Sequence, residues 1–310
     1  MQTILGANGQ IAIALAQELI QHYTDDIRLV SRHPVKINST DTLFPADLMD
    51  PVLTAKAVAG SDIVYFTVGL PMDTPLWVAQ FPIIMRNVID ACKQHQAKLV
   101  FFDNTYMYPQ NDDVLTEDTP FAPVGTKGRI RGQMANMLLE EIASHQINAV
   151  ICRAPEFYGP GKTQSITNSL IFDKIRQHKT ARVLWRDDTI RTLIWTPDAS
   201  RATALIGNTP DAYDQTWHLP CDDQQITYKS FIATAAEIYQ RELPYKVIPG
   251  WVLKTGALFN RQLKEIKELL PRYAHNNIFD SSRFKQRFPA FHITSYEEGI
   301  RLIKAEQERN

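Results

Sequence analysis

The chain has 310 residues, 44% of them apolar and 22% charged, and its 33 basic and 34 acidic residues leave a formal net charge of −1. These ordinary globular values exclude a disordered chain or a small disulfide scaffold, and the balanced charge gives no overall field that would draw the chain to nucleic acid or a membrane. Three widely spaced cysteines outside any metal-binding pattern indicate reduced thiols in a cytoplasmic protein. We expect neither a membrane span nor a secretory signal, because no apolar run is long enough and the first residues lack the signal pattern.

Up to residue 153 the sequence alternates short apolar runs with longer segments of helical periodicity, as in βαβ units of a parallel sheet. The predicted strands are residues 3–5, 27–31, 43–45, 63–68, 98–103 and 149–153. The predicted crossover helices are residues 10–22, 51–59, 76–94 and 127–145. Pro82 is expected to kink the third helix or to mark its true start. This order predicts an α/β fold with a Rossmann-type doubly wound parallel sheet.

After residue 153 the elements become shorter, with helical segments at 231–241 and 253–270 between loops rich in glycine, proline and aspartate. We therefore expect a dinucleotide-binding domain over residues 1–155. Residues 156–310 are expected to form mainly a smaller C-terminal α/β substrate-binding lobe, with some segments returning to the Rossmann sheet. Four tryptophans either line a substrate pocket or, as the commoner case, belong to the core: Trp185, Trp195, Trp217 and Trp251. The histidines show no metal-binding spacing, so no catalytic metal is expected.

A glycine turn separates the first predicted strand from the first predicted helix. Gly6 permits a tight turn, Gly9 lets the backbone approach a diphosphate, and Ala12 keeps the helix close to the sheet. The start of the helix adds free N–H groups and the positive end of its dipole. The predicted cofactor-binding residues of this turn are Gly6, Asn8, Gly9, Gln10 and Ile11, and a plain structural turn is the alternative interpretation.

The end of the second predicted strand indicates which cofactor is bound. Arg32 stands where an NAD site would carry an acidic residue for the ribose 2′-hydroxyl, and its guanidinium suits a 2′-phosphate, so NADP is expected and NAD stays possible. A solvated surface arginine is the alternative. Asp47, followed by Leu48, either meets the adenine amino group or caps the next helix. The tip of the fourth strand, at the edge where such folds bind ligands, adds Thr67, Val68 and Gly69.

Together with the glycine turn, several further segments resemble the extended short-chain dehydrogenase/reductase superfamily, which includes the NAD-dependent epimerases and dehydratases. The resemblance covers nearly the whole chain. The segments that carry it are Asp103 to Tyr108, Arg153 to Gly161, Thr196 to Ala199, Asp280 to Phe284 and Thr294 to Gly299. It implies a nicotinamide cofactor, with Pro155 at the family's nicotinamide-contacting proline.

The resemblance also implies a catalytic Tyr-x-x-x-Lys pair, from which this sequence departs. Lys127 stands in the tyrosine position and Arg131 in the lysine position, while the usual serine falls on or beside Asn104 and Thr105. Such a sequence resembles the atypical subgroup of the superfamily. Arg131, a permanent cation, is expected to hold the ribose hydroxyls and to be a poor general base.

Tyr106, after the fifth strand, is the first candidate to replace the missing tyrosine, although packing under a loop accounts for it equally well. Tyr108, Lys127, Glu156 and Tyr158 lie within plausible loop reach. Glu156 is either an acid/base or, as the favoured interpretation, a carboxylate that caps the loop around Gly159.

The leading hypothesis is an NADP(H)-binding oxidoreductase or epimerase-like enzyme that acts on a small polar carbonyl or sugar-nucleotide substrate. The competing hypothesis is a regulator or sensor that binds NADP(H) without catalysis, and the third is a purely structural relative that binds no nucleotide. The expected partner is a small molecule, with neither nucleic acid nor membrane. A homodimer through residues 76–94 and 127–145 is what the resemblance implies.

Overall fold

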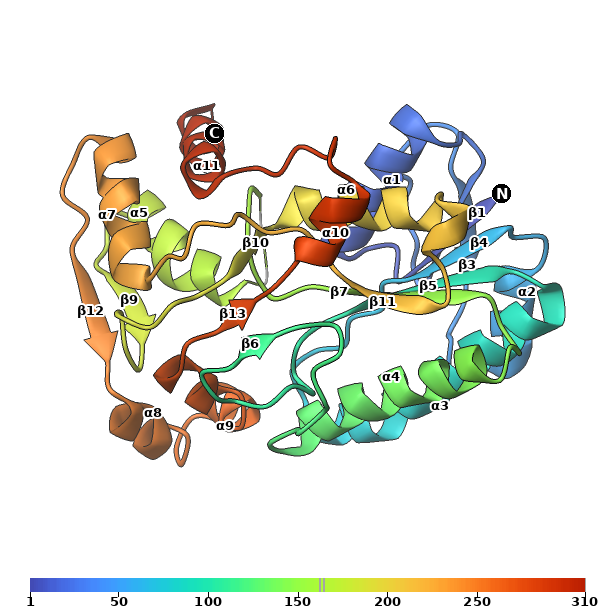
Figure 1. The fold of residues 1–310 in the computed structure, drawn as a ribbon, viewed down its shortest axis with the longest axis horizontal. Coiled ribbons are helices and arrows are strands. Elements are labelled where there is room, and N and C mark those ends of the chain that lie inside the picture. The colour runs from blue at the N-terminus through green and yellow to red at the C-terminus, as the bar shows by residue number, and fades with distance from the viewer. Residues whose placement is uncertain (162, 164, 310) are drawn as a thin grey trace. The chain divides into compact units, whose positions relative to one another are not determined.

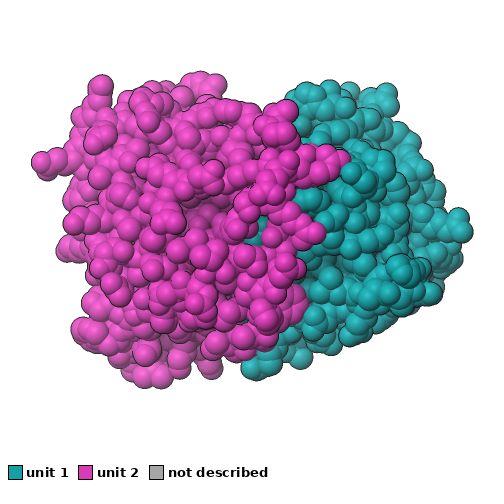
Figure 2. All heavy atoms as spheres, in the orientation of Figure 1, with its two compact units in different colours: residues 1–107, 126–154, 199–219 teal, residues 108–125, 155–198, 220–310 magenta. Residues whose placement is uncertain are grey.

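The computed structural model describes residues 1–161, 163 and 165–309, and its chain forms two compact units. Unit 1 consists of residues 1–107, 126–154 and 199–219, and unit 2 of the described residues of 108–125, 155–198 and 220–310 (Figure 2). The chain therefore passes between the units several times, and each unit is assembled from three stretches of sequence.

Unit 1 contains a seven-stranded parallel sheet with the strand order β11-β7-β5-β4-β1-β2-β3. Its strands are β1 (Gln2–Leu5), β2 (Ile27–Ser31), β3 (Thr42–Pro45), β4 (Ile63–Phe66), β5 (Lys98–Asp103), β7 (Ala149–Arg153) and β11 (Gln215–His218). From β1 the chain adds β2 and β3 on one side, and it then returns to add β4 and the later strands on the other side of β1. Open parallel sheets bind ligands at such a switch point, outside the carboxyl ends of the strands. The prediction of a Rossmann-type doubly wound sheet is confirmed.

Helices cover both faces of this sheet, with α3 and α4 side by side on one face and α1 on the other (Figure 1). The helices are α1 (Gln10–His22), α2 (Pro51–Val58), α3 (Thr74–His95), α4 (Thr126–Ala143) and α6 (Thr196–Gly207), of which α6 begins in unit 2. Asp73 caps α3 by accepting a hydrogen bond from Leu76 N at 3.0 Å, so the helix starts at Thr74. Pro82 lies inside α3 and does not mark its start.

Unit 2 contains three two-stranded parallel pairs and most of the remaining helices. The pairs are β8 (Glu156–Tyr158) with β10 (Leu193–Trp195), β9 (Ala181–Leu184) with β12 (Tyr245–Ile248), and β6 (Val114–Leu115) with β13 (Ile278–Phe279). The helices are α5 (Asp173–Arg176), α7 (Tyr228–Tyr239), α8 (Gly250–Gly256), α9 (Arg261–Ile266), α10 (Ser282–Arg287) and α11 (Tyr296–Arg309). Single turns are η1 (Asn168–Phe172), η3 (Leu270–Ala274) and, in unit 1, η2 (Pro210–Ala212).

The prediction of one helix over residues 253–270 is wrong, because α8 ends at Gly256 and α9 begins at Arg261. The side chain of Asn260 accepts a hydrogen bond from Leu263 N at 3.0 Å, and this cap starts a new helix. The core of the unit is aromatic, with the ring of Tyr158 lying 5.2 Å from that of Trp195 and 5.5 Å from that of Phe231.

Candidate functional site

The turn after β1 brings the ends of two neighbouring strands into contact. Gly6 has a φ of +89°, which side-chain-bearing residues rarely adopt, and a Cβ atom built on it would lie 2.8 Å from Val68 Cα and 2.9 Å from Val68 N. The amide of Gly6 donates to the carbonyl of Val30 at 2.9 Å, which ties the turn to β2 as well. Glycine at this position is therefore required by the close approach of backbone to backbone.

The N-terminus of α1 presents backbone donors without a competing side chain. Gly9 is the N-cap residue and is exposed. Because it has no side chain, it makes no capping hydrogen bond to the amides of the first turn. Asn8 points its amide group elsewhere and donates to the carbonyl of His33 at 2.8 Å. Gln10 and Ile11 are half-buried at the start of the helix. These amides and the helix dipole provide a fitting cradle for a diphosphate.

Arg32 follows β2 directly and is exposed. Within the described part of the chain its guanidinium has no hydrogen-bond or ion-pair partner. A guanidinium without an internal partner retains all its donors for a ligand phosphate.

Asp47 and Leu48 lie in the segment after β3. The alternative that Asp47 caps the next helix is wrong, because the side chain of Asp50 accepts hydrogen bonds from the amides at the start of α2. Asp47 is exposed and accepts a hydrogen bond from Met49 N at 3.0 Å. Leu48 is buried, and its carbonyl accepts from Asn87 Nδ2 at 2.9 Å, so Asn87 of α3 fixes this segment and was not predicted from the sequence.

The residues after β4 stand at the same edge of the sheet. Thr67 bonds Leu5 twice, through its amide and through its hydroxyl, each at 2.9 Å from the carbonyl oxygen. Val68 is the residue against which Gly6 packs. A Cβ atom on Gly69 would meet nothing within 4 Å, so this position is open.

A buried ion-pair cluster lies at the end of β5. The side chain of Asp103, with no exposed surface, accepts hydrogen bonds from Arg131 Nε at 3.0 Å and from Arg153 Nε and Nη2 at 3.3 Å each. The guanidinium carbon of Arg131 also lies 5.4 Å from the ring centre of Phe81 and 5.1 Å from that of Phe101. Arg131, which we predicted to hold ribose hydroxyls, is thus 4% exposed and already engaged by a carboxylate.

Lys127 and Tyr106 share a tryptophan neighbour that sequence reasoning missed. Lys127 is fully buried on the first turn of α4, donates a short hydrogen bond to the hydroxyl of Thr74, and places Nζ 5.8 Å from the ring centre of Trp77. The half-buried ring of Tyr106 stacks on the same tryptophan with centres 6.3 Å apart. Trp77 is held by its own N–H, which donates to the carbonyl of Pro71 at 2.7 Å.

The two residues between β5 and Tyr106 set the turn. Asn104 Oδ1 accepts a hydrogen bond from the amide of Tyr106 at 2.9 Å, and Thr105 is 2% exposed. This hydrogen bond over two residues forms a local turn, and Asn104 thereby fixes the backbone of Tyr106.

In unit 2, Pro155 is buried and Glu156 lies at the start of β8. The prediction that Glu156 caps the loop around Gly159 is wrong, because the side chain of Asn168 bonds the amide and the carbonyl of Gly159, at 3.1 and 2.7 Å. Glu156 instead forms an ion pair with the buried Arg191, whose Nη2 lies 2.9 Å from Oε2.

Two phenols and the hydroxyl of Thr167, the latter at 3.3 Å, also donate to Glu156. Tyr228 and Tyr273 donate to Oε1 at 2.9 and 2.8 Å. Burial alone would raise the pKa of Glu156, but the charge of Arg191 and these hydroxyls bring the pKa below its ordinary value. Burial raises the pKa of both tyrosines. Glu156 is therefore an ionised, fully bonded carboxylate, poorly suited to be a free general base.

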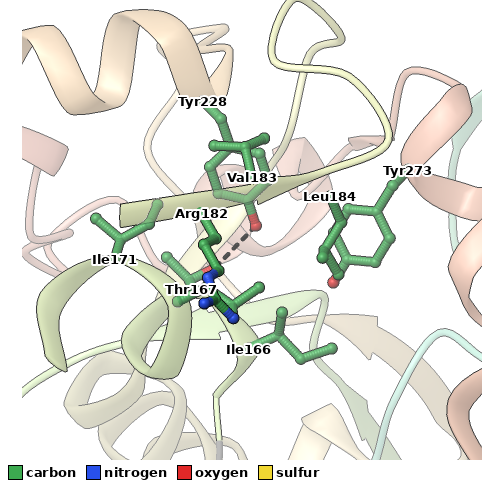
Figure 3. A pocket seen from close by; sticks show the side chains of 9 residues that line it. Ile166, Thr167, Ile171, Arg182, Val183, Leu184, Tyr228 and Tyr273 are labelled. Carbon is green, nitrogen blue, oxygen red and sulfur yellow. Dashed lines mark hydrogen bonds between the residues drawn. The ribbon is translucent and has the colours of Figure 1, made fainter. Parts of the chain in front are cut away.

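A small pocket borders this network (Figure 3). Tyr228 and Thr167 share a hydrogen bond of 2.9 Å at its wall, and Tyr273 lines it nearby. The remaining lining residues, mostly aliphatic, are Ile166, Leu170, Ile171, Arg182, Val183 and Leu184. Among the tryptophans predicted for core or pocket, Trp195 and Trp217 are buried and Trp251 is 71% exposed.

The described residues contain no group of three or more histidine, cysteine, aspartate or glutamate side chains that could hold a metal ion. None of the helices in the described chain is long and apolar enough to cross a membrane. What the structure does bring together in unit 1 is the set of strand ends at one edge of the sheet, with Gly6 on Val68 and Lys127 beside Trp77.

Comparison with known proteins adds a family and a set of similar folds. Residues 3–219 match the model of the NAD dependent epimerase/dehydratase family. No curated protein sequence matches the chain. Solved structures match over nearly their full length at low sequence identity, which shows the fold alone.

One similar structure is UDP-glucuronic acid 4-epimerase from Bacillus cereus in complex with UDP-glucuronic acid and NAD, with 14% identity, a TM-score of 0.81, and coverage of 100% of this chain and 99% of that one. UDP-glucose 4-epimerase from Thermus thermophilus in complex with NAD has 14% identity, a TM-score of 0.77 and coverage of 99% of both chains. The enzyme WbmH from Bordetella bronchiseptica in complex with NAD+ has 17% identity, a TM-score of 0.74, and coverage of 99% and 97%.

Proposed function

Because the chain belongs to the NAD dependent epimerase/dehydratase family, we propose that it is an NADP(H)-dependent oxidoreductase or epimerase that acts on a small polar carbonyl or sugar-nucleotide substrate. The observation that carries the proposal is the uncapped N-terminus of α1 beside the turn at Gly6 and Gly9. The sugar-nucleotide class is supported by the similar structures, two of which are UDP-sugar 4-epimerases.

The residues that would hold the cofactor are the backbone from Gly6 to Ile11 for the diphosphate, Arg32 for the 2′-phosphate and Asp47 for the adenine amino group. Thr67, Val68 and Gly69 would line its path along the strand ends, and Pro155 is proposed at the nicotinamide. When bound, the nicotinamide supplies a hydride donor or acceptor.

Tyr106 is the proposed proton donor and acceptor. It is the only residue with a phenol among those that we predicted to be catalytic, and the phenol is the group that the missing tyrosine would have supplied. Asn104 fixes its backbone and Trp77 its ring. Lys127 would contribute a positive charge. Arg131 bonds Asp103, so we assign it to holding the end of β5 and the start of α4 together.

The test is turnover by the purified chain, measured from the nicotinamide absorbance band with NADPH and a panel of carbonyl compounds, and by product analysis with UDP-sugars and NADP. Tyr106→Phe is expected to reduce the rate by at least about 100-fold while cofactor affinity changes little, because one proton-transfer group is removed. Lys127→Met is expected to lower the rate as well. Turnover that is unchanged in Tyr106→Phe would remove this residue from the mechanism.

The alternative is a regulator that binds NADP(H) without chemistry, and the engagement of Arg131 by Asp103 favours it. Tight cofactor binding without turnover on the whole panel, together with a partner retained only in one cofactor state, would favour this alternative over the enzyme.

Location in the cytoplasm and a homodimer through α3 and α4 are further parts of the proposal, and light scattering of the purified chain tests the dimer.

A further inference from the structure

Unit 2 exposes a group of large apolar side chains on and directly after α8. The exposed fractions are 71% for Trp251, 37% for Val252, 72% for Leu258 and 88% for Phe259. Backbone hydrogen bonds continue the helical turn beyond Gly256, since the amides of Leu258 and Phe259 donate to carbonyls three residues earlier, both at 3.1 Å. We call residues 250–260 the apolar segment.

The exposed apolar side chains lie on one side of α8 and of the helical turn that follows it. At about 100° per residue, Trp251, Val252, Leu258 and Phe259 fall within an arc of about 120°. Leu253, which is 3% exposed, lies on the opposite side and belongs to the core of unit 2. The exposed face thus carries four large apolar side chains with the exposed Thr255 among them, and we call this group the apolar stripe. Large apolar side chains gathered on a surface mark an interaction site.

Contacts beneath α8 hold the segment in place. A Cβ atom on Gly250 would lie 2.5 Å from the ring of Trp185, so the helix start packs directly on this tryptophan. Lys254 extends across the same ring, with Nζ 5.3 Å from its centre. The apolar stripe therefore points outward from an anchored helix.

The segment that carries this stripe has a positive net charge. Residues 246–267 contain five basic side chains, all exposed, and a single acidic one, although the whole chain has a net charge of −1. The basic residues are Lys246, Lys254, Arg261, Lys264 and Lys267. The attraction of a protein to a charged surface acts within about a Debye length, so the basic residues near the surface matter more than the net charge of the whole chain.

We propose that residues 246–267 dock the chain on an anionic lipid surface, with Trp251, Leu258 and Phe259 inserted at the interface and the exposed Lys246, Arg261, Lys264 and Lys267 near lipid phosphates. Tryptophan and phenylalanine on one face with lysine and arginine at its borders is the composition of segments that lie in the membrane interface. The docking is peripheral and involves no span, and it is independent of the proposed chemistry.

The test is co-sedimentation of the full chain with vesicles of phosphatidylcholine, with and without one third phosphatidylglycerol. We expect binding to the anionic vesicles, and strong weakening at high salt because the lysine contacts are screened. Phe259→Ser is expected to weaken binding by about tenfold, and Lys264→Gln with Lys267→Gln by about 25-fold, at roughly fivefold per basic residue. Leu302→Ser, on the exposed side of α11, is the matched control and should bind as the parent does.

Circular dichroism of each variant checks that the fold is kept, which the high exposure of Phe259 leads us to expect. The proposal is overturned if the parent does not bind anionic vesicles at low salt, or if Phe259→Ser binds as tightly as the parent. It is also overturned if light scattering shows a dimer that Phe259→Ser dissociates while vesicle binding is absent, because the stripe would then join two copies of the chain.

Discussion

Removing the charge of Asp103 is the sharpest test of how the end of β5 is held. Its carboxylate is fully buried and accepts hydrogen bonds from two buried guanidinium groups, those of Arg131 and Arg153. Asp103→Asn keeps the size of the side chain but leaves both cations without this partner. Breaking a buried pair in this way costs about 3–5 kcal/mol, because the remaining charge stays desolvated.

The free energy of unfolding from urea titration measures the loss. The control is Glu297→Gln, which breaks an ion pair with Arg301 whose side chains are 61% and 62% exposed and should change stability by less than about 1 kcal/mol. A second substitution, Arg131→Met on the background of Asp103→Asn, should restore part of the loss, since one stranded cation is removed. If Asp103→Asn costs no more than Glu297→Gln, the cluster does not hold the two elements as we argue.

Three other predictions concern the glycine turn, the cofactor and acid stability. Gly6→Ala should cost about 2–4 kcal/mol in thermal or urea unfolding, because its φ is +89° and its Cβ would lie 2.8 Å from backbone, while Gly69→Ala, with open space around it, should be nearly neutral. In calorimetric titration Arg32→Asp should weaken NADP binding about 10- to 100-fold and should not weaken NAD binding, because an acidic side chain at this position can bond the ribose 2′-hydroxyl; a parent that prefers NAD would contradict this. The hydrogen bond from Lys93 lowers the pKa of Glu141, so its contribution to stability is present above the ordinary glutamate pKa and lost as the pH falls through the lowered value. The stability difference between parent and Glu141→Gln should therefore shrink in acid, and a difference that persists would refute the assignment.

Much of the sheet could be predicted because its buried strands are short continuous apolar runs. The predicted bounds of β2, β5 and β7 are those of the structure. β11, which completes the sheet, was not located from the sequence. Its residues Gln215–His218 mix polar and apolar types, and they are strand because β7 supplies backbone partners from a segment more than sixty positions earlier. Such long-range pairing leaves no local signal.

In the candidate site, too, local features could be predicted from the sequence, and contacts between distant residues could not. The glycine turn was visible because Gly6 and Gly9 act through their own backbone, at a fixed distance from the first strand. The partner of Arg131 was not visible, because Asp103 is 28 positions away and only the fold brings them together. Trp77 looked like one more apolar residue of a helix, and its contacts with Lys127 and Tyr106 exist only in three dimensions.

The buried cations on α4 bear on whether the departure from the Tyr-x-x-x-Lys pattern abolishes function. Lys127 and Arg131 are four residues apart, so they lie on one helix face and repel each other. Both are buried, and burial of a cation is costly unless other groups compensate it, as Asp103 does for Arg131 and as Thr74 and Trp77 do for Lys127. An apolar residue of similar length would fill the place of Lys127 at lower cost. If the charge of Lys127 serves the proposed reaction, Lys127→Met should fold and lose turnover, whereas in a purely structural relative the same substitution should change stability alone.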